Sequence, residues 1–161
     1  MSRRLWTACL VLALAGCRAT TADPAAGVDV ALTLDRLHRA AAEADEQAYF
    51  ELFAPDAVFL GTDPSERWTR AEFRAWARPY FSAGRGWTYE AVERNVRLSE
   101  AGDVAWFDER LRNTSYGECR GTGVAVRIDG RWRIAQYSLS LPVPNELASD
   151  LVERIRQLPP E

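Results

Sequence analysis

Residues 103–111, DVAWFDERL, set two adjacent carboxylates in an otherwise largely apolar segment. Successive side chains of a β-strand point to opposite faces of the sheet, so the two acids cannot share one environment. One face would carry Ala105, Phe107, Glu109 and Leu111, and the other Trp106, Asp108 and Arg110. The first set is the more continuously apolar. We therefore expect Glu109 inside and Asp108 outside, an assignment that a slip of one residue would reverse.

Three further segments alternate with the same period and are predicted to be long strands: 87–98 (WTYEAVERNVRL), 118–128 (ECRGTGVAVRI) and 131–141 (RWRIAQYSLSL). Asp129-Gly130 between two of them indicates a tight type I′ hairpin. The alternation predicts these inward-facing side chains: Val92, Arg94, Val96, Leu98, Arg120, Thr122, Val124, Val126, Ile128, Trp132, Ile134, Gln136, Ser138 and Ser140.

Helical patterns surround this sheet. One helix is predicted to begin at an N-cap Thr33, and a short second one at Asp45. A short strand over 57–61 follows. Thr69-Arg70-Ala71-Glu72 fits the capping box of a third helix. The apolar face of this helix would consist of Phe73, Trp76, Ala77, Tyr80 and Phe81. Pro79 predicts that the helix is kinked or ends early. A terminal helix capped by Asn145 is predicted, with Leu147, Leu151, Ile155 and Val152 as its apolar face.

The N-terminus has the layout of an export signal. Arg3 and Arg4 precede an apolar run that is too short for a permanent membrane helix, which needs about 20 residues. The run ends in Leu14-Ala15-Gly16-Cys17, which resembles the lipobox of bacterial lipoproteins and implies acylation of Cys17. We therefore expect a signal peptide over 1–16, a tether over 17–32 and a domain over 33–158. Arg18 after the cysteine favours the outer membrane, facing the periplasm.

Composition narrows the classes of partner. Without residues 1–16 the chain has 161 − 16 = 145 residues and a formal charge of (20 − 2) − 23 = −5, with no basic run for nucleic acid. Only Cys119 remains as a thiol, so no disulfide or cysteine metal cluster is expected. We predict no metal and no cofactor, since the sequence has no glycine-rich phosphate loop and no cluster of ligands.

The order of elements resembles the nuclear transport factor 2-like superfamily, and within it the SnoaL-like branch. The resemblance rests on residues 49–58 (YFELFAPDAV), 103–111 and 130–140 (GRWRIAQYSLS). It implies an α+β fold: a cone-shaped barrel of curved antiparallel sheet, with N-terminal helices on its concave face and here a C-terminal helix in addition. Members include isomerases, dehydratases, cyclases and binding modules, so the fold does not fix the function.

The acid–base residues of the enzymatic members are incomplete in this chain. Where ketosteroid-isomerase-like members have an aspartate base, this sequence has Gly61, with Asp63 nearby. His38 is the single histidine, and the family's histidine positions on the last strand are Gln136 and Ser138. The known catalytic sets therefore cannot be carried over.

A buried Glu109 is expected to contact Arg94 or Arg120, because an unpaired carboxylate would protonate or destabilise the fold. Three interpretations stay open: a structural ion pair, a site in which an arginine binds a ligand, and catalysis with Glu109 and His38 as acid–base candidates. The candidate ligand-binding residues are Glu109, Arg94, Arg120, Gln136, Ser138, His38 and Tyr80.

The opposite face of the sheet would carry Trp106, Tyr137 and Leu139, which is apolar enough to predict a homodimer interface. The favoured function is a lipid-anchored domain of the cell envelope that binds a small, partly apolar ligand in the cone. The alternatives are an enzyme of the isomerase, dehydratase or cyclase kind, and a non-catalytic dimeric assembly module whose cone is filled by side chains.

Overall fold

One curved sheet of six strands organises the domain in the computed structural model, which describes residues 24–159. The strand order is β2-β1-β6-β5-β4-β3, and every neighbouring pair is antiparallel except β1 and β6, so the sheet is mixed. The strands are β1 (Phe53–Leu60), β2 (Arg67–Thr69), β3 (Glu90–Leu98), β4 (Val104–Asn113), β5 (Gly117–Ile128) and β6 (Arg131–Ser140). The four predicted long strands are confirmed, and the short β2 is an addition.

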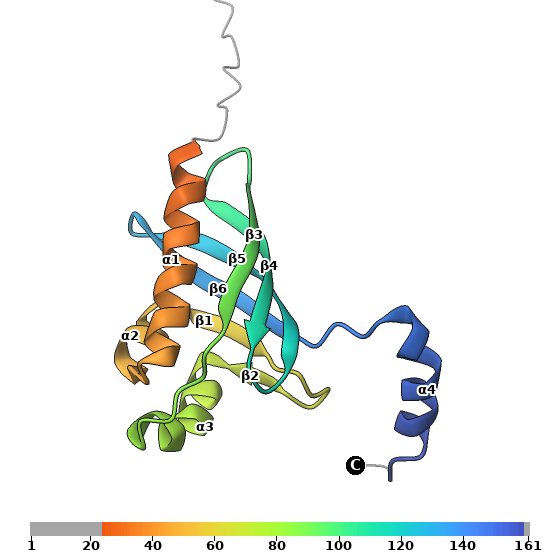
Figure 1. Ribbon diagram of the computed structural model, residues 1–161. Coiled ribbons are helices and arrows are strands. Elements are labelled where there is room, and N and C mark those ends of the chain that lie inside the picture. Colours follow the sequence, from red (N-terminus) through yellow and green to blue (C-terminus); the bar gives the residue numbers. More distant parts are fainter. Residues whose placement is uncertain (1–23, 160–161) are drawn as a thin grey trace, which may run out of the picture.

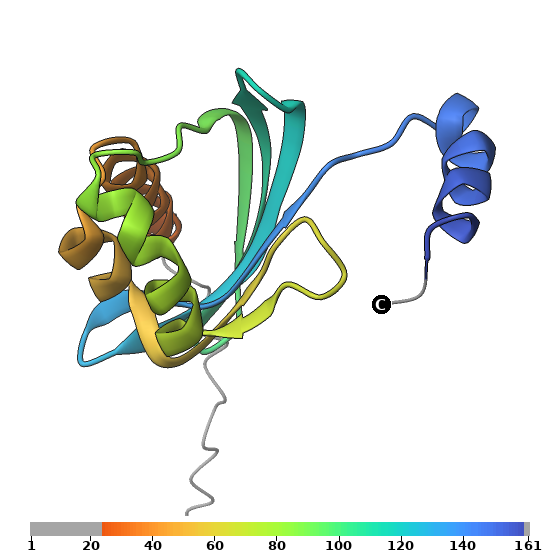
Figure 2. The ribbon, with the colours of Figure 1, turned by 90° about the horizontal axis from the view of Figure 1, so that it is seen from below.

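Three helices cover the concave face of the sheet, which gives the predicted α+β cone (Figures 1 and 2). They are α1 (Pro24–Ala42), α2 (Glu46–Glu51) and α3 (Arg70–Ser82). The fourth helix, α4 (Asn145–Arg156), stands away from the convex side of the sheet (Figure 2). The predicted signal, the lipobox and Cys17 lie outside the described residues.

The first helix is longer than predicted, because it begins at Pro24 and takes in residues 24–32 of the expected tether. Val30 and Leu34 are fully buried, so the apolar stripe extends well before Thr33. Thr33 is therefore not an N-cap: its hydroxyl donates to the carbonyl of Asp29, 2.9 Å away, one turn earlier.

The capping predictions for the next two helices are confirmed. The Asp45 carboxylate accepts from the backbone N–H of Ala48, and Thr69 and Glu72 form the reciprocal capping box of α3. Pro79 does not end α3 early, since the helix continues to Ser82.

Strand β4 has the predicted register. Ala105, Phe107, Glu109 and Leu111 are buried, whereas Trp106, Asp108 and Arg110 are exposed. The Asp129-Gly130 turn is also confirmed, because both residues have positive φ, 49° and 75°.

The inward face of β5 was predicted wrongly. Cys119, Gly121, Gly123 and Ala125 point inward, while Arg120 is exposed opposite Arg110 and Thr122, Val124 and Val126 face outward. The cause is space: a Cβ at Gly121 would lie 2.2 Å from the Tyr137 hydroxyl, and one at Gly123 would lie 2.6 Å from the Phe107 ring. Large neighbours fill the interior here, so the inward residues are small and the alternation of hydrophobicity is inverted.

The prediction for β6 was right for its first half and wrong for its second. Trp132 and Ile134 are buried, but the pairing with β5 shifts between Val124 and Ala125, which leaves Ala135 as an extra residue. Beyond this bulge Tyr137 and Leu139 turn inward, and Gln136, Ser138 and Ser140 do not. Tyr137 and Leu139 therefore cannot belong to the outer interface that was predicted, and only Trp106 remains there.

The terminal helix forms as predicted but buries nothing. Pro144 rather than Asn145 is its N-cap, and no side chain caps it. Leu147, Leu151 and Ile155 are all exposed, so the apolar face of this helix is left uncovered within the described chain.

The packing around Gly123 predicts the effect of adding one methyl group. Gly123→Ala should lower the free energy of unfolding by about 1–3 kcal/mol, because the new Cβ would meet the Phe107 ring and the Gln136 carbonyl. Gly27→Ala is the matched control: a Cβ there has nothing within 4 Å, so Gly27→Ala in α1 should instead raise it by roughly 0.5–1 kcal/mol. Urea denaturation measures both, and a neutral Gly123→Ala would contradict the close packing.

Candidate functional site

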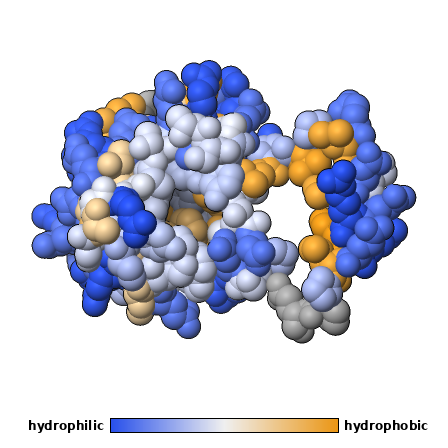
Figure 3. All heavy atoms as spheres, turned by 60° about the horizontal axis from the view of Figure 1, so that its bottom comes forward, coloured by the Kyte–Doolittle hydropathy of each residue, from blue (hydrophilic) through white to orange (hydrophobic). Residues whose placement is uncertain are grey.

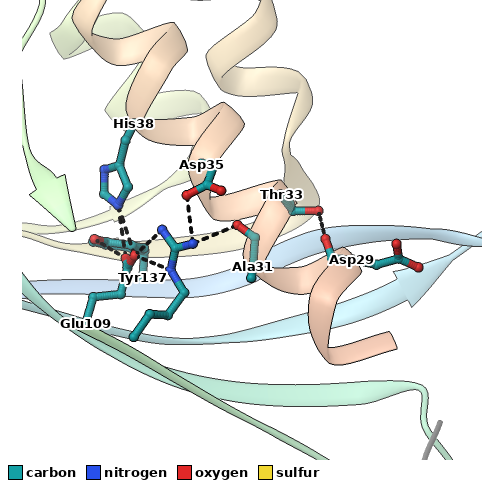
Figure 4. A network of polar contacts seen from close by, with 8 residues as sticks. Asp29, Ala31, Thr33, Asp35, His38, Glu109 and Tyr137 are labelled. Atoms are coloured by element: carbon teal, nitrogen blue, oxygen red, sulfur yellow. Dashed lines mark hydrogen bonds and ion pairs between the residues drawn. The ribbon is translucent and has the colours of Figure 1, made fainter. Parts of the chain in front are cut away.

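Glu109 is the centre of a buried polar network that joins the sheet to α1 (Figure 4). Its side chain has no exposed surface. The Oε2 atom lies 3.0 Å from Nε2 of His38 and accepts from the Tyr137 hydroxyl at 3.2 Å. The Oε1 atom accepts from Nε of Arg94 at 2.7 Å and lies 3.2 Å from the same His38 nitrogen. Both carboxylate oxygens therefore have their partners inside the protein.

Arg94 continues the network to the surface of α1. Its Nη1 donates to the Ala31 carbonyl at 2.9 Å and to the Asp35 carboxylate at 2.8 Å. Its Nη2 lies 2.7 Å from Oε1 of Glu109 as an ion-pair contact, but off the direction of a hydrogen bond. One guanidinium thus connects β3, β4 and two turns of α1, and the predicted arginine partner of Glu109 is Arg94.

The contacts decide the charge of Glu109. Burial alone would raise the pKa of this carboxyl, but the hydrogen bond and charge of His38 and those of Arg94 outweigh it, so the pKa lies below its ordinary value of 4.5. The pKa of Tyr137 is raised well above 10 by burial and by the nearby Glu109 charge. Glu109 is therefore an ionised, fully engaged acceptor, which is a poor general base and a good group for orienting His38.

His38 borders a small cavity beside the network. It lines a cavity of about 20 Å³ together with Tyr137, Tyr89, Phe59 and Leu139, among others. This volume suits about one water molecule. Because Nε2 contacts the carboxylate, Nδ1 is the nitrogen left for other partners, and it has no hydrogen bond within the described chain.

The remaining sequence-predicted residues do not join this network. Arg120 and Gln136 are exposed on the outer side of the sheet, and Ser138 also faces that way, for the reasons given for β5 and β6. Tyr80 lies on α3 and lines a different pocket. The structure thus brings together Glu109, Arg94 and His38, and adds Tyr137, which was assigned to the wrong face.

An aromatic pocket of about 380 Å³ opens beside α3 and shares Phe59, Trp87, Tyr89 and Leu139 with the small cavity. We use this name for the hollow whose aromatic lining is Phe59, Trp68, Phe73, Trp76, Tyr80, Trp87, Tyr89 and Tyr116. Several of these rings are nearly parallel: Phe59 and Phe73 at 16°, and Trp68 and Phe73 at 4°. Figure 3 looks toward the end of the domain where α3 lies and shows a hollow there.

Polar groups in the aromatic pocket are few. The hydroxyls of Tyr80, Tyr89 and Tyr116 form no hydrogen bond with another described residue, and burial raises the pKa of Tyr89 to about 12. The Tyr89 hydroxyl therefore stays protonated at neutral pH, and a tyrosine hydroxyl can donate a hydrogen bond to a ligand. Thr62, Glu66 and Arg85 also line the pocket, and the Glu66 carboxylate accepts a hydrogen bond from the backbone N–H of Asp63.

Sequence reasoning missed most of this pocket, because it assigned the aromatic stripe of α3 to the core. Phe73, Ala77 and Phe81 are indeed buried, but Trp76 and Tyr80 are 43% and 41% exposed. The available signal was crowding: residues 68–89 hold more large rings than one helix face can bury. No three His, Cys, Asp or Glu side chains gather as a possible metal site in residues 24–159. No helix of that part of the chain is long and apolar enough to cross a membrane.

The network predicts a pH-dependent stability centred on Glu109. A carboxyl with a lowered pKa in the folded state stabilises the fold above its unfolded pKa, near 4.5, and this contribution is lost as the pH falls through the folded value. Glu109→Gln leaves Arg94 without its buried counter-charge and should cost about 3–5 kcal/mol at pH 7, and less under acid conditions. Denaturant unfolding across the pH range measures this.

Asp108→Asn is the control for that experiment. The same chemical change on the exposed neighbour should alter stability by no more than about 0.5 kcal/mol. Equal effects at positions 108 and 109 would contradict the assignment of Glu109 as the buried anchor.

Comparisons with known proteins agree with this architecture. The family model of the SnoaL-like domain matches residues 30–144. An NTF2-like protein of unknown function from Pseudomonas putida KT2440 has a TM-score of 0.67 at 19% identity, with 78% of this chain and 93% of that chain covered. A DUF3225 protein of unknown function from Pectobacterium atrosepticum has a TM-score of 0.59 at 24% identity, with 75% and 94% covered.

A candidate scytalone dehydratase from Novosphingobium aromaticivorans has a TM-score of 0.61 at 14% identity, with 72% of this chain and 83% of that chain covered. A search of curated proteins finds no match. Likeness at these identities establishes the fold, while the family match spans most of the chain. The chain therefore belongs to the SnoaL-like family, within the NTF2-like fold.

Proposed function

We propose that this protein binds a small, flat, largely apolar organic molecule in the aromatic pocket. The observation that carries the proposal is the pocket itself: about 380 Å³, lined by eight aromatic side chains. Ligand pockets typically measure about 300–1,000 Å³ and combine an apolar lining with a few polar groups. An assembly module with a filled cone would have no need of such a hollow.

The ring geometry supports a flat ligand. Trp68 is nearly parallel to Phe59, Phe73 and Trp76, at 18°, 4° and 25°. Aromatic rings that already stack in one direction can extend the stack with one more ring, and each such pair contributes about 0.5–1.5 kcal/mol beyond burial. The tyrosine hydroxyls at the pocket can then orient a polar substituent of the ligand.

A larger hollow is a weaker candidate for this ligand. It measures about 530 Å³ and lies between α1 and the β5–β6 hairpin. Its lining is dominated by charges of both signs, including Arg36, Arg39, Glu43 and Arg131. Solvated mixed charges are typical of a protein surface, whereas concentrated aromatic side chains are typical of a site for an apolar ligand.

A second candidate function is proton-transfer catalysis of the isomerase, dehydratase or cyclase kind. The observation that favours it is the small cavity beside His38, which shares four lining residues with the aromatic pocket. In this alternative His38 would exchange the proton, and Glu109 would hold the imidazole in place as a positioning residue. The lowered pKa of Glu109 argues against the paired acid–base role considered from the sequence.

We also propose that a lipid on Cys17 anchors the domain to a membrane of the bacterial cell envelope and that the domain faces the periplasm. The support is the order of basic residues, apolar run and lipobox in residues 3–17. Because α1 begins at Pro24, only residues 18–23 separate Cys17 from the fold. Six residues can span at most about 20 Å, so the domain would stay close to the bilayer.

Trp76→Ala should weaken ligand binding roughly tenfold, since it removes a stacked ring from the pocket. Native mass spectrometry of the purified protein would identify a copurifying molecule, and quenching of tryptophan fluorescence by 2-naphthol, a flat bicyclic probe, would report the affinity. Trp106→Ala is the control: this ring is similarly exposed, at 48%, but lies on the outer face of the sheet.

Equal losses of affinity in Trp76→Ala and Trp106→Ala would refute binding in the aromatic pocket. The same sample separates the two functions. Chemical conversion of the copurified molecule, abolished in His38→Gln while binding persists, would favour the enzyme.

Cys17→Ser should move the protein from the membrane fraction to the soluble fraction, because it removes the proposed site of acylation. Cys9→Ser should leave the protein in the membrane, since Cys9 lies within the predicted signal. Detergent partition and the mass of the N-terminal peptide measure both. An unmodified Cys17 in the mature protein would rule the anchor out.

A further inference from the structure

Helix α4 is amphipathic and has no partner in its own chain. None of its residues is buried, and Leu147, Leu151, Val152 and Ile155 are between 39% and 56% exposed. Such a stripe is unfavourable in water, because the hydrophobic free energy grows with the apolar area left exposed. Contiguous exposed apolar surface on a protein usually marks an interaction site.

The apolar side of α4 faces the domain across an open gap. Figure 3 shows hydrophobic atoms along the side of the helix that is turned toward the body of the protein and hydrophilic atoms on its far side. Figure 2 places the helix on the convex side of the sheet, opposite α1, α2 and α3. The surface that α4 faces is therefore the outer face of the sheet.

The segment before α4 holds the helix away from its own sheet. Residues 141–144, LPVP, contain two prolines, and Pro144 has φ −56° and ψ 139°, close to the polyproline II conformation. Proline-rich segments of this conformation act as semi-rigid spacers. A short stiff spacer projects α4 outward and disfavours its folding back onto the strand that it has just left.

The outer face of the sheet carries a complementary row. Trp106 of β4 pairs with Val124 of β5, which pairs with Gln136 of β6, and Gln136 pairs with Val58 of β1. No layer of the described chain covers this row, and Trp106 is 48% exposed. Three of its four members are apolar and the fourth, Gln136, is exposed at its middle, so the row can accept a leucine stripe.

Charges beside this row match those of α4. Arg97 lies opposite Trp106 on β3, and neither Arg97 nor Arg120 has an ion pair among the described residues. Helix α4 carries the acids Glu146, Asp150 and Glu153 along its length, without ion pairs among the described residues, and the basic Arg154 and Arg156 in its last turn. Opposite charges around an apolar contact add orientation and specificity more than affinity.

We propose that α4 of one copy packs on the outer sheet face of a second copy, and that the exchange is reciprocal. A two-fold axis would place each Leu151 stripe over the partner's Trp106 row, so that both unpartnered surfaces are covered in one closed dimer. The stiff spacer favours this exchange, because α4 can reach a second copy without the chain turning back toward its own sheet. This interface does not depend on what the aromatic pocket binds.

The first test is the size of the full chain in detergent micelles by light scattering. We expect a dimer at micromolar concentration that becomes monomeric in Leu151→Asp, with the circular dichroism of the domain unchanged. Ser149→Asp adds the same charge on the polar side of α4 and should leave the dimer intact. A monomeric parent chain, or a dimer that survives Leu151→Asp, would overturn the proposal.

The second test distinguishes exchange from folding back. A chain with both Val124→Cys and Leu151→Cys should form a disulfide-linked dimer under oxidation, since the paired positions would come from different copies. The two single-cysteine chains report the background from the natural cysteines. A disulfide closed within one chain, which migrates as a monomer, would show that α4 covers its own sheet and would refute the exchange.

Discussion

The buried carboxylate of Glu109 is the constraint around which the domain is arranged. Burial of a charge in a protein interior is costly unless partners replace the lost water, and here they come from three directions: His38 on α1, Arg94 on β3 and Tyr137 on β6. Each partner fixes the position of its own element relative to β4. The helix thus lies across the sheet at one depth, and the small cavity that His38 lines lies between the two.

This arrangement also limits the chemistry that is open to the site. A carboxylate with every acceptor position used cannot receive a further proton without losing a native contact. Catalysis at this site would need a group with an atom that is free to exchange a proton. Within the network that atom is Nδ1 of His38, because Nε2 contacts Glu109. The aromatic pocket, by contrast, needs no ionisable group to bind a flat molecule.

The sequence predicted the fold well and the interior only in part. The register of strand β4 was predicted correctly because the inward residues around Glu109 are apolar, so the alternation of hydrophobicity and the burial coincide. On β5 the inward positions include Gly121 and Gly123, where the neighbouring side chains leave no room for a Cβ. The more hydrophobic residues of this strand therefore lie on its outer face, and a prediction from hydrophobicity chose the wrong face. On β6 the extra residue Ala135 inverts the second half of the strand, and a bulge leaves no mark in a period-two pattern. Of the two arginines predicted as partners of Glu109, Arg94 contacts it and Arg120 does not, and the contact with Tyr137 was missed because that residue was assigned to the outer face.

The parallel pairing of β1 with β6 has a consequence for how the chain reaches its native state. Phe53 pairs with Ile134, and the Ile134 N–H donates to the Leu52 carbonyl at 2.8 Å. The neighbour of β1 on this side is β6, so β1 cannot complete its hydrogen bonds until nearly the whole chain has been synthesised. Contacts between residues so distant along a chain close slowly, because the loop entropy must be lost before the contact is gained. Closure of the sheet around β1 therefore has to wait until residues 131–140 have been synthesised, so the order of synthesis and the order of pairing differ for this strand.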